Sequence, residues 1–334
     1  MFLLLALIVV AVLAWVVTGT ARRIALRRAY LAEVDHRSSH ERPTPYGGGW
    51  GVMAGVLPAW TIIAVVADRP DLFVLLVAAV VLIGVSWIDD RRPLSAGLRL
   101  AVQATAVAAA ISMLPSDALV FQGWIPFWAD RLVVGIGWLW FVNLFNFMDG
   151  IDGIAGVETV ALGVGLAAVA VIAGPDAGAT LPEPMLGLTL AAAAAGFLVW
   201  NWHPARIFLG DVGSVPIGFL SAGLLVHLAA AGHLAAALIL PAYFLADATV
   251  TLVRRGLARE KVWQPHRTHF YQRAARRRGR HDAITLRVAA IDAALVGLAV
   301  AAAASGPAAL ALTAVALLAV ALFLWHLDRI ARAG

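Results

Sequence analysis

The chain has 334 residues, of which 62% are hydrophobic and 13% are charged. Ordinary soluble domains are about 45–50% apolar and about 25% charged, so this composition excludes a soluble globular enzyme and a disordered chain. A pI of about 10.4 is typical of nucleic-acid binding, but basic cytoplasmic loops give a membrane protein the same value, and we expect no nucleic-acid partner. The absence of cysteine excludes disulfides, thiolate nucleophiles and cysteine-ligated zinc.

Eleven apolar stretches follow one another along the chain, each close to the roughly 20 residues that a helix needs to cross a bilayer. The first begins at Phe2, and its arginines follow it rather than precede it. A signal peptide carries its positive charge in front, so we interpret this stretch as a first span. The predicted spans are 2–19, 49–67, 71–88, 98–114, 130–146, 155–173, 185–201, 214–231, 233–252, 285–304 and 308–326.

The distribution of basic residues predicts the orientation of these spans. With the N-terminus outside, every lysine and arginine except Arg69 and Arg131 falls on one face of the membrane. Basic loops mark the cytoplasmic face. We therefore predict an all-α polytopic integral membrane protein with a periplasmic N-terminus and a cytoplasmic C-terminus. It forms a single transmembrane domain over 1–334, with cytoplasmic loops at 19–48, 89–97, 146–154, 202–213 and 253–284.

Acidic residues gather at the predicted cytoplasmic ends of the spans, where their cost near a bilayer makes them functional candidates. Carboxylates that converge from three loops would repel one another unless a cation neutralises them. Oxygen ligands without cysteine favour Mg²⁺, or else Mn²⁺, over zinc. The alternative is that each aspartate only caps a helix or lies in a turn. The set comprises Asp89 and Asp90 after the third span, Asn146, Asp149 and Asp152 in NFMDGIDG, and Asp211 in FLGDVGS.

Two basic segments lie on the same predicted face. The segment HRTHFYQR carries His266, Arg267, His269 and Arg273, which we expect to bind phosphate because arginine forks match phosphate oxygens. The segment RSSHERPTPYGGGW contains three consecutive glycines, which allow close backbone approach and predict a loop that closes over a ligand. Together with the acids, these segments predict a metal-dependent phosphate site at the inner edge of the bilayer. Its substrates would be a soluble phosphate compound and a membrane lipid.

Five motifs, in this order, resemble those of a known family: HERPTPYGGG, WIDD, NLFNFMDGIDGIAG, NWHPARIFLGDVGS and HRTHFYQR. They are similar to motifs of the polyprenyl-phosphate N-acetylhexosamine-1-phosphate transferases (the MraY/WecA superfamily, glycosyltransferase family 4), and they span residues 36–273. SSHERPTPYGGG most resembles the O-antigen-initiating branch. HRTH differs from the adjacent histidines of the muramoyl-pentapeptide branch.

The resemblance implies an enzyme of the bacterial inner membrane with its active site facing the cytosol. It would transfer the sugar 1-phosphate of a UDP-N-acetylhexosamine (GlcNAc, QuiNAc or FucNAc type) to undecaprenyl phosphate, release UMP and start surface-polysaccharide synthesis. Asp211 and Asn146 would hold Mg²⁺. Asp89, supported by Asp90, would deprotonate or orient the lipid phosphate, so that the catalytic set is Asp89, Asp90 and Asp211. Donor contacts would come from Asp149, Asp152, Asn201, Phe208, His266, Arg267, His269 and Arg273.

Other functions stay open at this point. Peptidoglycan precursor transfer is one alternative. A CDP-alcohol phosphotransferase would need alanine and arginine at positions 156 and 157, where the chain has Gly156 and Val157. A transporter or flippase would place its acids near the bilayer midplane, where the predicted spans contain only Glu158, Asp247 and Asp292. A non-catalytic scaffold would leave the three acidic clusters unexplained.

Several details of the predicted enzyme are also left open. The phosphate-binding arginine after the aspartate pair is either Arg92 or Arg99, and Tyr46 stands where this branch often has a basic residue. The sugar, the lipid length, and direct transfer versus a two-step route through a carboxylate are undecided. A second copy of the chain is a candidate partner, but small-residue patterns are too common in alanine-rich helices to decide the oligomeric state.

Overall fold

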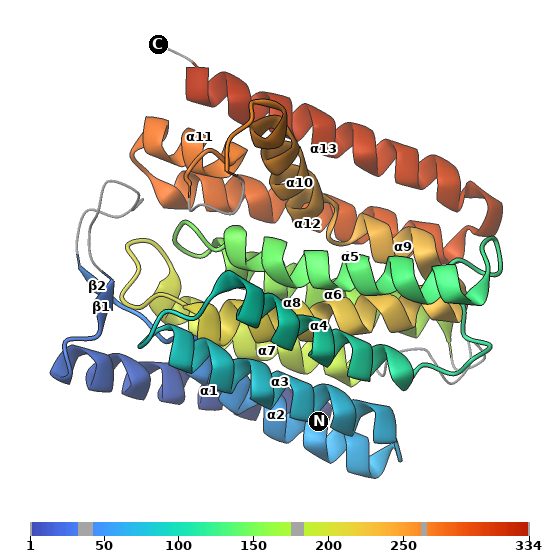
Figure 1. Ribbon diagram of the computed structural model, residues 1–334, viewed down its shortest axis with the longest axis horizontal. Coiled ribbons are helices and arrows are strands. Elements are labelled where there is room, and N and C mark those ends of the chain that lie inside the picture. Colours follow the sequence, from blue (N-terminus) through green and yellow to red (C-terminus); the bar gives the residue numbers. More distant parts are fainter. Residues whose placement is uncertain (1, 33–42, 175–183, 262–265, 333–334) are drawn as a thin grey trace.

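The computed structural model describes residues 2–32, 43–174, 184–261 and 266–332, and it is a bundle of long helices (Figure 1). A two-residue strand pair, β1 (Leu31–Ala32) and β2 (Thr44–Pro45), is its only sheet in these ranges. The predicted all-α class is otherwise confirmed. The helices are α1 (Phe2–Arg27), α2 (Gly49–Val66), α3 (Pro70–Asp89), α4 (Ala96–Ser112), α5 (Phe127–Phe147), α6 (Ile154–Ala173), α7 (Pro184–Asn201), α8 (Asp211–Leu228), α9 (Leu234–Ile239), α10 (Ala242–Leu257), α11 (Phe270–Arg278), α12 (His281–Ala304) and α13 (Ala309–Arg332).

Every predicted span coincides with helix, but the predicted count of eleven is not confirmed. Within the described ranges, eight helical segments are long and apolar enough to cross a membrane. The boundary predicted between the eighth and ninth spans coincides with a kink, but α8 and α9 still form one helical run, Asp211–Ile239. The ninth predicted span is divided again before α10, which has 16 residues. Gly232 permits the kink inside that run at a φ of 94°, and Pro241, which has no N–H to donate, separates α9 from α10.

The outer helices present large apolar side chains to the surroundings. Leu4 of α1 is 64% exposed, and Leu317 and Leu318 of α13 are 58% and 60% exposed. Contiguous apolar surface of this kind marks a membrane-facing protein. Helices suit that environment because they satisfy their own backbone hydrogen bonds without water.

Helix α8 lies at the centre of the bundle, and nearly all of its side chains are buried. Trp138 of α5 packs on Phe219 of α8 with ring centroids 5.3 Å apart, and its indole N–H donates to the Phe219 carbonyl at 2.9 Å. Because α8 is held on all sides, its first residue, Asp211, has a fixed position.

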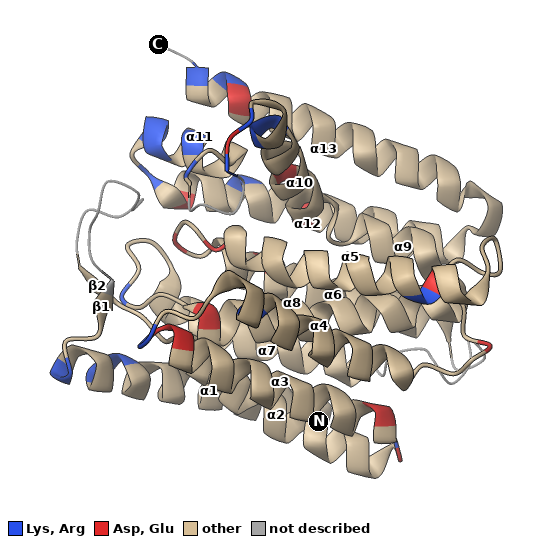
Figure 2. Ribbon diagram, viewed as in Figure 1, with Lys and Arg blue, Asp and Glu red and all other residues tan. Residues whose placement is uncertain are grey.

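Charged side chains are concentrated toward one end of the bundle (Figure 2). The C-terminal ends of α1, α3, α5, α7 and α13 lie at this end, together with α11 and the strand pair (Figure 1). The loops that carry the predicted acids therefore open on the same end of the molecule.

Candidate active site

Two glycine-rich segments join at the charged end of the bundle. The backbone N–H of Gly48 donates to the Phe208 carbonyl at 2.8 Å, and that of Gly49 donates to the Leu209 carbonyl at 2.9 Å. A Cβ on Gly49 would collide with the backbone of Gly213. The close backbone approach expected at the three glycines is thus present, and the approaching segment is the chain's own FLGDVGS. The first part of the predicted loop, 37–42, lies outside the described residues.

Four carboxylates from three segments converge beside this junction. Asp89 and Asp90 end α3, Asp149 follows α5, and Asp211 begins α8. Burial, followed by the charges of Asp211 and Asp89, raises the pKa of Asp90 to about 7. Burial, followed by Asp211 and Asp152, raises the pKa of Asp149 well above its ordinary value. Carboxylates that raise one another's pKa form a strongly negative site, which favours binding of a cation.

Asp89 is already occupied by partners within the chain. One of its carboxylate oxygens accepts from the Leu94 N–H at 2.6 Å, and the other pairs with Arg99 at 3.0 Å. Of the two arginines left open by the sequence, Arg99 therefore contacts the aspartate pair. The adjacent Asp90 has no comparable cation contact among the described residues, since Arg91 stacks over the Trp87 ring, 3.8 Å from its centroid.

A cavity of about 370 Å³ opens beside Asp90, between α1 and α3. Its walls are mostly apolar and include Trp50, Trp87 and aliphatic residues of α1, with Arg91 at the polar end. Tyr46, which replaces the basic residue common in the related branch, also lines it. The cavity can therefore accommodate an apolar group whose polar end reaches Asp90.

The predicted metal ligands are adjacent to each other. Asp211 interacts with the Asn146 side chain, and Asn146 accepts a hydrogen bond from the Ser214 hydroxyl at 2.6 Å. Among the described residues, the converging acids do not form a closed metal cage. Mg²⁺ usually takes only one or two protein ligands and completes its shell with water and phosphate oxygens. Asp211 and Asn146 fit such an open site.

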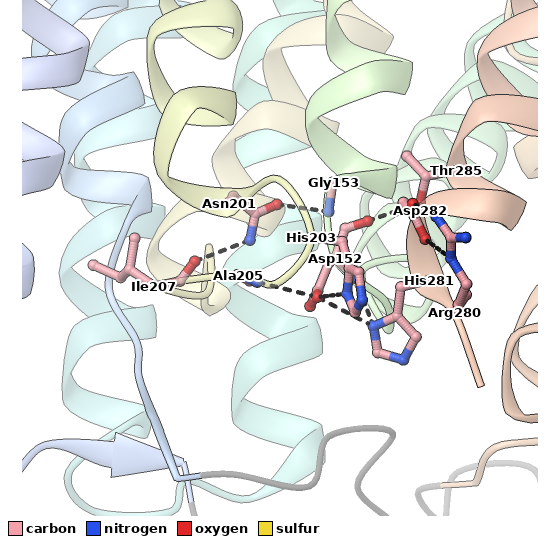
Figure 3. Close-up of polar contacts among 10 residues, drawn as sticks. All are labelled: Asp152, Gly153, Asn201, His203, Ala205, Ile207, Arg280, His281, Asp282 and Thr285. Carbon is pink, nitrogen blue, oxygen red and sulfur yellow. Dashed lines mark hydrogen bonds and ion pairs between the residues drawn. The ribbon is translucent and has the colours of Figure 1, made fainter.

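Asp152 lies next to the acids in a separate polar network (Figure 3). Its carboxylate contacts His203 Nδ1 at 2.6 Å and accepts from the Ala205 N–H at 3.1 Å. Asn201 links the same two loops, because it accepts from the Gly153 N–H and donates to the Ile207 carbonyl, both at 2.9 Å. Both ends of the Asn201 side chain are used within the protein, so this residue holds the two loops together.

Two residues of this network were not among the predicted site residues. His203 is part of the same NWHPAR motif as Asn201, so its position in that motif was an available signal. His281, the first residue of α12, contacts Asp152 at 3.4 Å across 129 positions of sequence. No local pattern connects residues so far apart.

The basic segment is anchored by a buried carboxylate. Asp247 of α10 accepts from the N–H groups of Phe270 and Tyr271, at 3.1 and 3.2 Å, at the start of α11. It also contacts His269 Nδ1 at 3.2 Å. The sequence placed Asp247 inside a span without a role, whereas the structure makes it the residue that fixes His269.

The remaining predicted phosphate-binding residues lie in different surroundings. His266 stacks on His269 with centroids 4.8 Å apart. Burial, then His269, then Arg255 lower the pKa of His266 to about 4, so this imidazole is neutral near pH 7. Arg273 pairs with Asp328 of α13 at 2.9 Å. The Arg267 carbonyl accepts from Arg276 at 3.3 Å.

Helix α11 also contacts the acidic loop. The Tyr271 hydroxyl donates to the Phe147 carbonyl at 3.0 Å, and a Cβ on Gly150 would collide with the same tyrosine. The DGIDG loop and the HRTHFYQR segment are therefore neighbours.

Comparisons with known proteins agree with this arrangement. Residues 72–229, which include the acidic motifs from WIDD to FLGDVGS, match the model of Glycosyl transferase family 4. This match confirms the resemblance of the motifs to the family.

Relatives of more than one kind share the match. A protein of Bacillus subtilis named as a probable undecaprenyl-phosphate N-acetylglucosaminyl 1-phosphate transferase is 28% identical over 77% of this chain and 73% of its own length. A decaprenyl-phosphate N-acetylglucosaminephosphotransferase of Mycobacterium tuberculosis is 28% identical over 79% of this chain and 73% of its own length. A phospho-N-acetylmuramoyl-pentapeptide-transferase of Shouchella clausii is 28% identical over 54% of this chain and 60% of its own length.

Proposed function

We propose that the chain transfers N-acetylhexosamine 1-phosphate from a UDP-linked donor to undecaprenyl phosphate and releases UMP. The observation that carries the proposal is the convergence of Asp90, Asp149 and Asp211 beside an apolar cavity. A site for two phosphate substrates, one of which carries a hydrocarbon chain, needs both features. The names of the relatives from Bacillus and Mycobacterium support the donor and acceptor classes.

The reaction is a phosphoryl-group transfer with balanced bonds. An oxygen of the lipid phosphate attacks the phosphorus attached to the sugar, the bond from that phosphorus to the UMP oxygen breaks, and UMP leaves with the electron pair. Such transfer depends mainly on positioning and on neutralising phosphate charge. Mg²⁺ held by Asp211 and Asn146 would supply that neutralisation on the diphosphate.

Asp90 is the better placed residue to receive the acceptor. It lines the apolar cavity, whereas both oxygens of Asp89 are held by Leu94 and Arg99. A pKa of about 7 for Asp90 suits a group that accepts a proton or a hydrogen bond from a phosphate near neutral pH. We therefore assign acceptor contact to Asp90 and give Asp89 the role of holding the end of α3 to Arg99, the reverse of the order expected from the motif.

The donor occupies the opposite side of the acids. Asp149, Asp152 and Phe208 border the nucleotide, and Asn201 holds the two loops between which it lies. We assign donor-phosphate contact to His269, which Asp247 fixes, and to His266 and Arg267 of the same segment. Uridine recognition by these loops and phosphate recognition by the basic segment together select a UDP-sugar.

The charge pattern supports a cytosolic orientation of the active site. The end of the bundle that carries the acids also carries most of the arginines (Figure 2), and basic ends face the cytoplasm. The active site lies at the inner membrane and faces the cytosol, the compartment in which UDP-sugars are made. The lipid-linked product starts surface-polysaccharide synthesis.

The experiment is UMP release by purified protein in detergent. The reaction contains undecaprenyl phosphate, Mg²⁺ and either UDP-GlcNAc, UDP-QuiNAc, UDP-FucNAc or UDP-MurNAc-pentapeptide, with a control that lacks lipid. We expect UMP only when lipid and Mg²⁺ are present, and only with the hexosamine donors. Asp211→Asn should abolish turnover, while Asp117→Asn, an exposed aspartate outside the acid cluster, should not. Release with the pentapeptide donor alone would replace this proposal by the peptidoglycan role.

A further inference from the structure

Asp152, His203 and His281 form a cluster that the proposed transfer reaction does not use as a unit. They come from the loop after α5, the loop after α7 and the first residue of α12. Each offers one ligand atom, and these atoms all lie within 4.8 Å of one another, which no other set of three such residues does in the described ranges. Figure 3 shows both imidazoles directed at the Asp152 carboxylate.

The donor set differs in kind from the acid cluster. Two imidazole nitrogens and one carboxylate oxygen suit Zn²⁺, Co²⁺ or Ni²⁺, whereas Mg²⁺ prefers oxygen ligands alone. Three protein ligands with a fourth position open to water are typical of non-structural zinc sites. The cluster therefore has the composition of a site for a borderline divalent metal.

The spacing of the donors is close to what a tetrahedral ion needs. Ligands about 2.0–2.2 Å from zinc lie about 3.3–3.5 Å from one another. His281 Nδ1 is 3.4 Å from the Asp152 carboxylate, which fits this spacing. His203 Nδ1 is 2.6 Å from it, a hydrogen-bond distance that would open by roughly 0.8 Å. His203 lies on a loop and its side chain is 30% exposed, so it has room to move and gives the ion a path to the site.

The surroundings orient the ligands, and the arginine adjacent to His281 is paired with an acid. The Ala205 N–H donates to the Asp152 carboxylate, and the Thr285 hydroxyl donates to the Asp152 carbonyl at 2.7 Å. Outer contacts of this kind hold metal ligands in place. Arg280, next to His281 in sequence, is paired with Asp282 at 2.5 Å. Asp149 adds negative charge nearby.

We propose that Asp152, His203 and His281 bind one Zn²⁺-like divalent ion per chain, at a site separate from the Mg²⁺ site at Asp211. In the metal-free protein the same three residues are joined by hydrogen bonds, which hold the loops after α5 and α7 to α12. Asp152 is shared with the proposed nucleotide site, so binding of the ion is measured on the protein without substrates.

The test is metal titration of untagged, full-length protein in detergent after chelation and dialysis. We expect one equivalent of Zn²⁺ by calorimetry, and Co²⁺ should give the visible absorption of a tetrahedral ion that Zn²⁺ then displaces. His203→Asn and His281→Asn keep a side chain that can donate to Asp152 but remove an imidazole. Each should weaken binding by more than about tenfold, since even outer-shell changes cost about 10–100-fold in metal affinity.

His227→Asn is the matched control. His227 also contacts a carboxylate, Asp71, at 3.4 Å, but within the described part of the chain it belongs to no set of three potential ligands. This variant should therefore bind Zn²⁺ as the unmodified protein does. Melting temperatures confirm that each variant is folded. Absence of saturable binding to folded protein, or equal affinity in His281→Asn and His227→Asn, would overturn the proposal.

Discussion

Removal of the Asp247 carboxylate should detach the basic segment from the bundle. In Asp247→Ala, the N–H groups of Phe270 and Tyr271 lose their acceptor, and His269 loses its partner. Asp247 is fully buried, so these donors would be left without water. Loss of a helix N-cap costs about 1 kcal/mol, and buried unsatisfied donors cost about 1–3 kcal/mol. A combined cost of about 2–4 kcal/mol shifts the equilibrium between docked and undocked α11 by about 30- to 1,000-fold.

Two readouts measure this effect. The first is the kcat/KM for the UDP-sugar, which should fall by at least about tenfold in Asp247→Ala as His269 loses its position. The second is labelling of a cysteine introduced in place of Gln272, a buried residue of α11. The chain has no cysteine of its own, so faster labelling in the Asp247→Ala background reports undocking directly. Thr251→Val, which removes only a 3.4 Å contact to Asp247, is the matched control. Unchanged labelling and unchanged kcat/KM in Asp247→Ala would refute the anchoring role.

Three further predictions concern the acids, the glycine junction and Arg273. Without divalent metal, the contribution of Asp90 to the free energy of unfolding should fall as pH rises from about 4 to about 7 and level off above 7. Between these pH values the folded state holds a proton on Asp90 that the unfolded state has lost. Melting curves of Asp90→Asn should lack this pH dependence. Gly49→Ala should cost about 1–3 kcal/mol by overpacking against α8, measured by thermal unfolding, while Gly84→Ala, with nothing within 4 Å, should be neutral or stabilising. If Arg273 binds phosphate as the motif predicts, Arg273→Ala should reduce kcat/KM more than Asp328→Ala does. Equal reductions would show that Arg273 acts only through its ion pair with Asp328.

The sequence predicted helix positions well because the bilayer imposes its own length. About 20 apolar residues between charged loops define a span regardless of tertiary contacts. The boundary predicted between the eighth and ninth spans coincides with the kink at Gly232, but the second break, at Pro241, was missed because apolar composition continues through it. The break at Pro241 depends on backbone conformation, which hydropathy does not report.

The sequence predicted which motifs belong to the site, because loops on the same membrane face must lie at the same end of the bundle. The convergence of Asp90, Asp149 and Asp211 follows from that rule. The contacts of Asp247 with α11 and of His281 with Asp152 do not, because each depends on how helices distant in sequence pack. Exact partners within one end of a bundle come only from tertiary structure.

The central claim is that the acid cluster transfers sugar phosphate to a lipid phosphate. The most direct measurement is mass spectrometry of the lipid fraction together with UMP quantification, after incubation of purified protein with undecaprenyl phosphate, Mg²⁺ and UDP-GlcNAc. We predict undecaprenyl-diphosphate-N-acetylhexosamine and UMP in equal amounts, and neither product with Asp211→Asn. UMP without the lipid product, or equal product from the Asp211→Asn variant, would contradict the account.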